Sequence, residues 1–97
     1  MIVSYRSRTL RRFWVKGQKR VITTGLHERV TQILTLLEAA SQPQGLEFPG
    51  LFLHGLSGNL SGHWSVRVTA NLRITFRFDG LDIADVDLLD HHQELDS

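Results

Sequence analysis

Residues 63–79 read HWSVRVTANLRITFRFD, and the alternation of side chains in this stretch decides the fold. Apolar residues alternate with polar ones on both sides of Ala70-Asn71, which predicts two antiparallel strands joined by a tight turn. One face of this hairpin is apolar. The other face carries Ser65, Arg67, Thr69, Arg73, Thr75 and Arg77. The stretch therefore predicts a sheet with one buried face and one polar face.

The segments on either side of this hairpin extend the sheet. Asp79-Gly80 is a strong turn signal, and the sequence DIADVDLLD at 82–90 predicts a third strand of a meander. At the other end of the chain, residues 2–5 (IVSY) are rich in β-prone side chains and predict a short edge strand.

Two helices are predicted between these strands. An apolar stripe in residues 9–16 indicates a short first helix that ends before Gly17. The longer helix begins near Gly25, with Thr24 as its N-cap, and ends before residues 42–45 (QPQG). Its apolar face consists of Leu26, Val30, Ile33, Leu34, Leu37 and Ala40. Residues 43–50 are expected to form a loop.

This order of elements predicts an α+β fold, with two helices on one side of a small antiparallel sheet. The chain has 97 residues, so we expect one domain over residues 1–97 with a polar tail at 93–97. It has no cysteine, no recognisable signal peptide and no apolar run of about 18 residues, which predicts a cytoplasmic protein without a membrane span.

The net charge of +1 hides a strong asymmetry. Residues 1–20 carry Arg and Lys without any acid, whereas residues 79–97 carry acids without any Arg or Lys. Such asymmetry is typical of a surface that binds nucleic acid or a partner. It is equally explained if the basic N-terminal segment packs beside the acidic C-terminal strand and the two neutralise each other.

The arginines of the polar face also admit two interpretations. They are either solvated surface residues or a positive patch that binds phosphate groups. The five histidines pose a similar choice. His54 lies in a glycine-rich loop, LFLHGLSGNLSGHW (51–64), and Asp90, His91 and His92 end the last predicted strand. Each alone is most simply a structural or surface residue.

Together these residues suit two chemistries. In RNA cleavage without a metal, the 2′-hydroxyl attacks the adjacent phosphate, histidines serve as general base and acid, and an arginine stabilises the charge. In the other chemistry, histidines and Asp90 bind a metal ion. However, neither the spacing of His54, His63 and the terminal pair nor the opposite directions of His91 and His92 in a strand suits one ion. We therefore expect no metal and no cofactor.

Three stretches of this chain resemble HigB-type toxins of the RelE/ParE toxin–antitoxin superfamily: residues 1–17 (MIVSYRSRTLRRFWVKG), residues 53–78 (LHGLSGNLSGHWSVRVTANLRITFRF) and residues 90–92 (DHH). The resemblance implies a compact RelE-like fold. It also implies an mRNA interferase that enters the A site of the 70S ribosome, cleaves mRNA and inhibits translation. Its implied partner is a HigA-like helix-turn-helix antitoxin, which alone would contact operator DNA.

The resemblance also assigns roles to residues. It implies that His54, Arg73, Asp90 and His92 are catalytic, with His91 where the family commonly has a tyrosine. Ser57 stands where a lysine is common and Thr69 where a basic residue is common, so both fall at RNA-binding positions. Arg67 lies two residues before Thr69 on the same strand face, and we expect it to hold RNA together with Arg77.

Two alternatives remain open at this point. One is a binding module without ribonuclease activity, such as a ParE-like gyrase inhibitor or a co-repressor acting with its antitoxin. The acid and base residues that the resemblance assigns argue against it, because ParE-type chains lack the loop histidine and the terminal Asp-x-His. The other alternative is a metal-dependent hydrolase.

Overall fold

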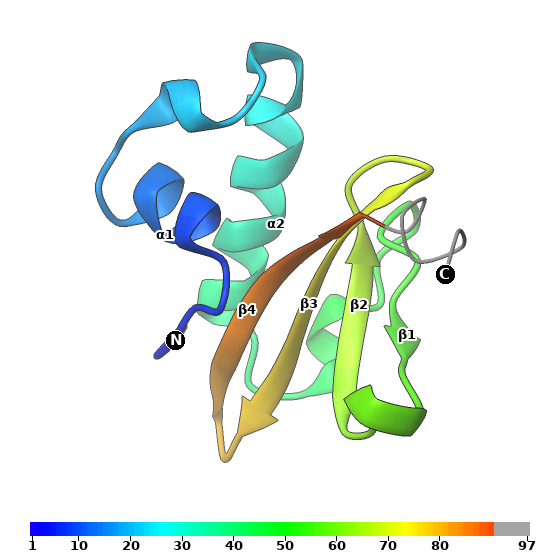
Figure 1. Cartoon of the computed structure of the whole chain (residues 1–97). Helices are drawn as coiled ribbons and strands as arrows, with labels where there is room; N and C mark the ends of the chain where they lie inside the picture. Colours follow the sequence, from blue (N-terminus) through cyan, green and yellow to red (C-terminus); the bar gives the residue numbers. More distant parts are fainter. Residues whose placement is uncertain (91–97) are drawn as a thin grey trace.

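The alternating stretch forms two neighbouring strands, β2 (His63–Arg67) and β3 (Leu72–Asp79), as predicted. The third predicted strand is also present as β4 (Asp82–Asp90). The computed structural model describes residues 1–90, and within this range the sheet is antiparallel with strand order β1-β2-β3-β4 (Figure 1). The first strand, β1 (His54–Gly55), was not predicted. It has only two residues, which are too few to show the alternation of side chains that marks a strand in a sequence.

The turn between β2 and β3 is wider than the predicted two-residue turn. The backbone amides of Val68 and Thr69 donate to the carbonyl of Leu72 at 2.8 and 3.0 Å, so β2 ends at Arg67. The Thr69 hydroxyl accepts hydrogen bonds from the amides of Asn71 and Leu72. Because the Thr69 side chain takes up these two amides, they are not available for pairing between the strands. The predicted first strand of the hairpin is therefore shorter in the structure.

The two predicted helices are α1 (Arg8–Trp14) and α2 (His27–Ala39). The hydroxyl of Ser7 caps α1 by accepting a hydrogen bond from the amide of Leu10 at 3.0 Å. Gly17 follows α1 with φ of +69°, a conformation that favours glycine and suits a helix stop.

The prediction that Thr24 caps the long helix is wrong. Residues Thr24–Leu26 form a 3₁₀ turn, and the amide of Leu26 donates to the carbonyl of Thr23 at 2.9 Å. This backbone bond satisfies an amide that a side-chain cap would otherwise serve, so α2 starts at His27 without a side-chain cap. The predicted loop at 43–50 likewise begins with a 3₁₀ turn, Pro43–Leu46, which buries Leu46.

Both helices cover the same face of the sheet (Figure 1). The core between the layers contains Leu10, Phe13, Val30, Ile33, Leu34, Leu37, Val66, Ile74, Phe76, Ile83 and Val86. These are the predicted apolar stripes of the helices and the apolar face of the strands. The face of the sheet that the helices cover is therefore buried in the core, and a ligand could reach the sheet only from the opposite, polar face.

The N-terminal segment runs parallel beside β4, but it pairs only through isolated bridges, Ile2 with Ile83 and Tyr5 with Val86. A β-bulge lies between the two bridges, where Asp85 adopts φ of +55° and the register between β3 and β4 shifts. The bulge interrupts the ladder that a continuous edge strand would need. The segment stays attached through backbone hydrogen bonds of 2.8 Å from Val3 to Ile83 and from Arg6 to Val86. In residues 1–90, no helix has the length and apolar character needed to cross a membrane.

Candidate functional site

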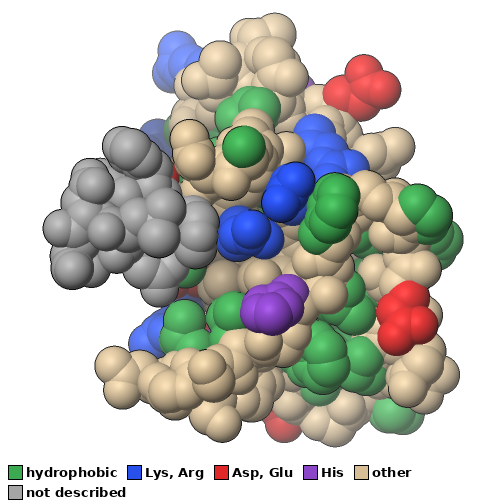
Figure 2. Space-filling view, turned by 90° about the vertical axis from the view of Figure 1, so that its right-hand side faces the viewer, with side chains coloured by type: hydrophobic (Ala, Val, Ile, Leu, Met, Phe, Trp, Pro, Cys, Tyr) green, Lys and Arg blue, Asp and Glu red, His purple; other side chains and the backbone are tan. Residues whose placement is uncertain are grey.

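A cavity of about 700 Å³ lies on the polar face of the sheet, beneath the loop that carries His54. The loop and β1 contribute Phe52, Leu53, His54, Gly55, Leu56, Ser57 and Leu60 to its lining, and the strands contribute Ser65, Arg67, Arg73, Thr75 and Leu89. Figure 2 shows the molecule from the β1 side, where basic side chains gather beside a histidine and hydrophobic side chains flank them. The cavity therefore brings together the predicted loop residues His54 and Ser57 and the predicted strand residues Arg67 and Arg73.

Two residues with hydroxyl groups contribute to the cavity lining from the strands. Ser65 and Thr75 lie opposite each other on β2 and β3, and their exposed fractions are only 1% and 4%. The alternation predicted that both belong to the polar face, but it did not predict their burial. Within residues 1–90, the Ser65 hydroxyl has no hydrogen-bond partner although it is buried. A buried hydroxyl of this kind is available to a ligand that enters the cavity.

Two arginines stand side by side in the cavity. Arg67 and Arg73 are directly opposite each other on β2 and β3, so their side chains leave the sheet on the same face. Like charges in such a pair destabilise a sheet. Among residues 1–90 no carboxylate lies within ion-pair distance of either guanidinium, and Nε of Arg67 is buried without a partner. This arrangement suits an anion that neutralises both side chains, and a phosphate group fits guanidinium geometry.

His54 lies next to this arginine pair. It pairs with Ser65, which lies two residues from Arg67 on β2, so His54 and the arginines occupy neighbouring rows roughly 7 Å apart along the strands. The imidazole is exposed and lines the cavity. His54 and Arg73 are thus brought together, with Arg67 beside them, on one face of the sheet.

Asp90 occupies a different position. It pairs with Leu72, the neighbour of Arg73, so its side chain leaves β4 on the face opposite to Arg73. Asp90 is exposed at the end of the strand and is not part of the cavity lining. His91 and His92 lie outside the described residues. The catalytic roles of these three residues stay predictions.

Of the four predicted RNA-binding residues, two line the cavity and two lie outside it. Ser57 and Arg67 line the cavity. Thr69 lies in the turn after β2, where its hydroxyl accepts hydrogen bonds from Asn71 and Leu72. Arg77 shares the strand face of Arg73 but lies beyond the cavity lining, and its Nε donates to the Asp85 carboxylate at 2.7 Å. Only Ser57 and Arg67 of this set are in position to contact a group bound in the cavity.

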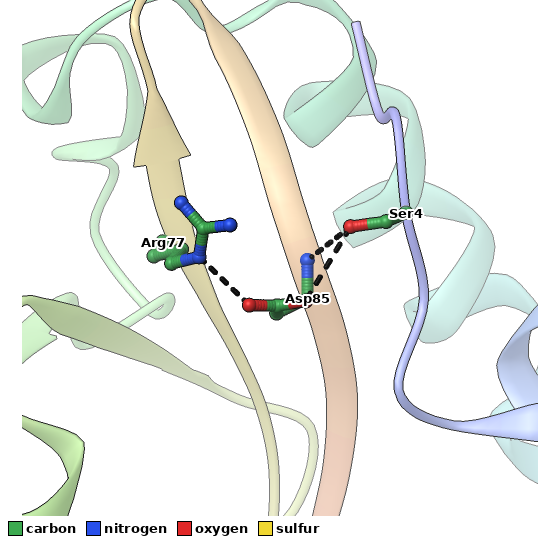
Figure 3. A network of polar contacts seen from close by, with 3 residues as sticks. All are labelled: Ser4, Arg77 and Asp85. Atoms are coloured by element: carbon green, nitrogen blue, oxygen red, sulfur yellow. Dashed lines mark hydrogen bonds and ion pairs between the residues drawn. The ribbon is translucent and has the colours of Figure 1, made fainter.

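Arg77 belongs instead to a polar network that attaches the N-terminal segment (Figure 3). The Ser4 hydroxyl accepts a hydrogen bond of 2.8 Å from the backbone amide of Asp85, and Asp85 in turn pairs with Arg77. The hydrogen bond from Arg77 lowers the pKa of Asp85, and the nearby charges of Arg77, Arg6 and His63 act in the same direction. The same hydrogen bond raises the pKa of Arg77. Both groups therefore stay charged near neutral pH.

Replacing Asp85 with asparagine is expected to lower the free energy of unfolding at pH 7, because it removes the ion pair with Arg77 and retains a side chain that tolerates positive φ. The pKa of Asp85 is lowered in the folded state, so its contribution is present above about pH 4 and is lost as the pH falls further. Denaturant unfolding at pH 7, 5 and 3 should show a difference between wild type and variant that is constant at the two higher values and shrinks at pH 3. The exposed carboxylate of Glu47 gives a control, Glu47→Gln, for which no comparable difference is expected.

His63 also lies on the polar face, directly opposite Arg77. Both of its ring nitrogens are buried and, within residues 1–90, have no hydrogen-bond partner. It does not line the cavity. In the same range, no three side chains of the His, Asp and Glu types are grouped so that they could hold a metal ion.

Three cavity residues were not predicted as functional from the sequence. Ser65 and Thr75 were assigned to the polar face, but the alternation alone does not indicate that they are buried. Phe52 lies at the cavity with φ of +52° and an exposed fraction of 55%. Nothing in the pattern of residues 51–64 indicates that a phenylalanine there adopts a left-handed conformation.

Comparisons with known proteins agree with the fold. Residues 3–92 match the family model described as the RelE-like toxin of the type II toxin–antitoxin system HigB. The chain is 30% identical to the protein named Endoribonuclease HigB from Proteus vulgaris, over 95% of this chain and 100% of that protein.

Solved structures show the same fold at lower sequence identity. YafQ from E. coli strain BL21(DE3) matches with a TM-score of 0.65 and 15% identity, covering 97% of this chain and 96% of that chain. A chain of the YoeB–YefM complex from Staphylococcus aureus matches with a TM-score of 0.63 and 16% identity, covering 94% and 95%. Together with the match over residues 3–92, these findings confirm the resemblance noted in the sequence, and the chain belongs to the HigB-like family of RelE-like toxins of type II toxin–antitoxin systems.

Proposed function

We propose that this toxin is an endoribonuclease that cleaves mRNA in the A site of the ribosome and thereby inhibits translation. The observation that carries the proposal is the pair Arg67 and Arg73, which face each other in a cavity beside His54 without a carboxylate among residues 1–90 to neutralise them. The name of the relative from Proteus vulgaris, Endoribonuclease HigB, supports the same activity.

The proposed reaction needs no metal ion. The 2′-oxygen of one nucleotide attacks the adjacent phosphorus while a general base removes its proton. The bond from phosphorus to the 5′-oxygen of the next nucleotide breaks, and a general acid protonates that oxygen. The products are a 2′,3′-cyclic phosphate and a 5′-hydroxyl. Histidine titrates near neutral pH and suits either proton transfer, so we assign His54 and His92 to these two roles.

The arginine pair supplies fixed positive charge. We propose that Arg73 stabilises the additional negative charge of the pentacoordinate phosphorus and that Arg67 holds the same or the neighbouring phosphate. The buried Ser65 hydroxyl and the exposed Ser57 lie in the same cavity and would donate hydrogen bonds to phosphate or ribose oxygens. Asp90 leaves β4 on the face opposite to Arg73, so the role we propose for it is to orient a terminal histidine and not to act as the base.

The partner of a type II toxin is an antitoxin, and the YoeB–YefM complex provides a related toxin in complex with another protein. For this chain we propose a HigA-like antitoxin with a helix-turn-helix fold, which would carry the contact with operator DNA. The exposed basic side chains of α1, such as Arg8, Arg11 and Arg12, would face ribosomal RNA in the cytoplasm.

Mapping RNA ends after brief expression of the chain without its antitoxin tests the proposal. We expect new 5′ ends within codons of translated mRNA, and we expect co-expression of the antitoxin to suppress them. Growth arrest without such ends would contradict the ribonuclease proposal and favour a binding module that blocks its target without cleaving RNA.

A further inference from the structure

Phe52 combines exposure with a backbone conformation that is rare for a bulky residue. Its φ is +52°, in the left-handed region that side chains larger than glycine or asparagine seldom adopt, and its exposed fraction is 55%. Such conformations persist where the surrounding structure enforces them, and they are frequent at ligand-binding sites. An exposed phenyl ring adds little to the core, so the fold itself gives no reason for this arrangement.

Hydrogen bonds to the two residues before Phe52 hold the backbone at this position in place. The amide of Arg67 donates to the carbonyl of Leu51 at 2.8 Å. The guanidinium of Arg29, on α2, donates to the carbonyl of Gly50 at 2.6 Å and to the carbonyl of Arg67 at 2.7 Å. These bonds tie the loop to β2 and to α2, so the phenyl ring is presented from a rigid support.

The ring is positioned against the proposed phosphate-binding group. The guanidinium carbon of Arg67 lies 4.1 Å from the centroid of the Phe52 ring, which is a cation–π contact. Phe52 lines the same cavity as His54 and Arg73. A phosphate held by the arginine pair would therefore bring the base attached to a neighbouring ribose within reach of the phenyl ring.

We infer that Phe52 forms a stacking subsite for a nucleobase next to the scissile phosphate, with Arg67 bridging the stacked base and the phosphate. This inference rests on the proposed ribonuclease function and goes beyond it by assigning a residue outside the acid and base set. Every base has a π-face, so stacking of this kind holds RNA with little preference for sequence. Phe52 thus positions the substrate and takes no part in proton transfer.

The experiment compares Phe52→Leu with Phe52→Tyr in the full chain, on ribosomes programmed with a short mRNA. The leucine variant removes the π-face and retains an apolar side chain, whereas the tyrosine variant retains the π-face at the same backbone position. Phe48 is a matched control, because it is an exposed phenylalanine with an exposed fraction of 50% that lies outside the cavity. Single-turnover cleavage at increasing toxin concentration separates the half-saturating concentration from the maximal rate.

We expect Phe52→Leu to raise the half-saturating concentration about 5- to 150-fold, the range typical of a lost aromatic–base stack, with a much smaller change in the maximal rate. Phe52→Tyr and Phe48→Leu should remain close to wild type. A second measurement uses mRNA with an abasic nucleotide on the 5′ or the 3′ side of the scissile phosphate. At one of these two positions, removing the base should raise the half-saturating concentration of wild type. The same removal should leave the half-saturating concentration of Phe52→Leu unchanged, because that variant has already lost the stack.

The outcomes separate this inference from the proposed function. If wild type cleaves RNA and Phe52→Leu has an unchanged half-saturating concentration, the stacking subsite is overturned while the ribonuclease proposal stands. Additive losses for the leucine variant and the abasic mRNA at both positions would also overturn the subsite, since they would show that Phe52 acts through the fold. If wild type does not cleave RNA at all, the proposed function fails and the subsite fails with it.

Discussion

His54→Ala is expected to reduce the single-turnover rate of mRNA cleavage about 10²- to 10⁴-fold, the contribution of one positioned acid or base. The reason is the position of His54, which lines the cavity one row of residues away from Arg67 and Arg73. Cleavage of a defined mRNA on programmed ribosomes, followed by gel separation of end-labelled RNA, measures the effect.

The control for this variant comes from the same loop. Asn59 is exposed and lies outside the cavity lining, so Asn59→Ala should cleave at a rate close to wild type. His54 is exposed, and its replacement should leave the unfolding transition nearly unchanged. A His54→Ala variant that retains wild-type cleavage would show that the proton transfers depend on other residues.

Arg73→Gln is expected to reduce the maximal rate about 10²- to 10³-fold, comparable to the loss of one donor that stabilises transition-state charge. The half-saturating concentration should change less, because Arg67 remains in place to hold phosphate. Arg73→Lys restores the charge without the planar pair of donors and should recover only part of the rate. The measurement is again single-turnover cleavage on programmed ribosomes.

Arg77→Gln provides the comparison, because it removes the same charge from the same face of β3. Arg77 is paired with Asp85 outside the cavity, so its replacement should lower stability more than it lowers the cleavage rate. If the two variants lost equal activity, the general positive charge of this face, and not the position of Arg73 in the cavity, would be responsible.

The structure confirms much of what the sequence predicts about the fold. The alternation in residues 63–79 gives the apolar and polar faces of β2 and β3, and the helical period gives the buried face of α2. These patterns are local, because each depends only on which side of a single helix or strand is buried in the core. The turn at Asp79-Gly80 is also local, and Gly80 adopts the positive φ of +62° that this turn requires.

Features that depend on distant contacts were not predictable in the same way. The strand β1 pairs with β2 over only two residues, and no local pattern marks this pairing or the burial of Ser65 and Thr75. The bulge at Asp85 changes which residues of β4 face the cavity, and no residue pattern in DIADVDLLD marks it. The helix start at His27 was missed for a local reason, because a backbone bond in a 3₁₀ turn takes the place of the predicted side-chain cap.

The candidate site was predicted in part. The sequence and its family resemblance indicated His54, Arg67 and Arg73, and the structure places these three residues in one cavity. Asp90 shows that the residue type at a position does not by itself predict where the side chain lies. Its pairing with Leu72 directs the side chain to the face opposite to Arg73. Phe52 carries no signal in sequence, since its relevance comes from a left-handed backbone and a contact with Arg67.

The chemistry of the cleaved RNA tests the central claim most directly. Single-turnover reactions would compare an all-ribose mRNA with one that carries a single 2′-deoxyribose at the nucleotide 5′ to the scissile phosphate. Attack by the 2′-hydroxyl predicts that the all-ribose mRNA yields a 2′,3′-cyclic phosphate and a 5′-hydroxyl, and that the deoxy-substituted mRNA is not cleaved at this position. Equal cleavage of both RNAs would show that water is the nucleophile and would contradict the assignment of His54 and Arg73 to a 2′-hydroxyl reaction.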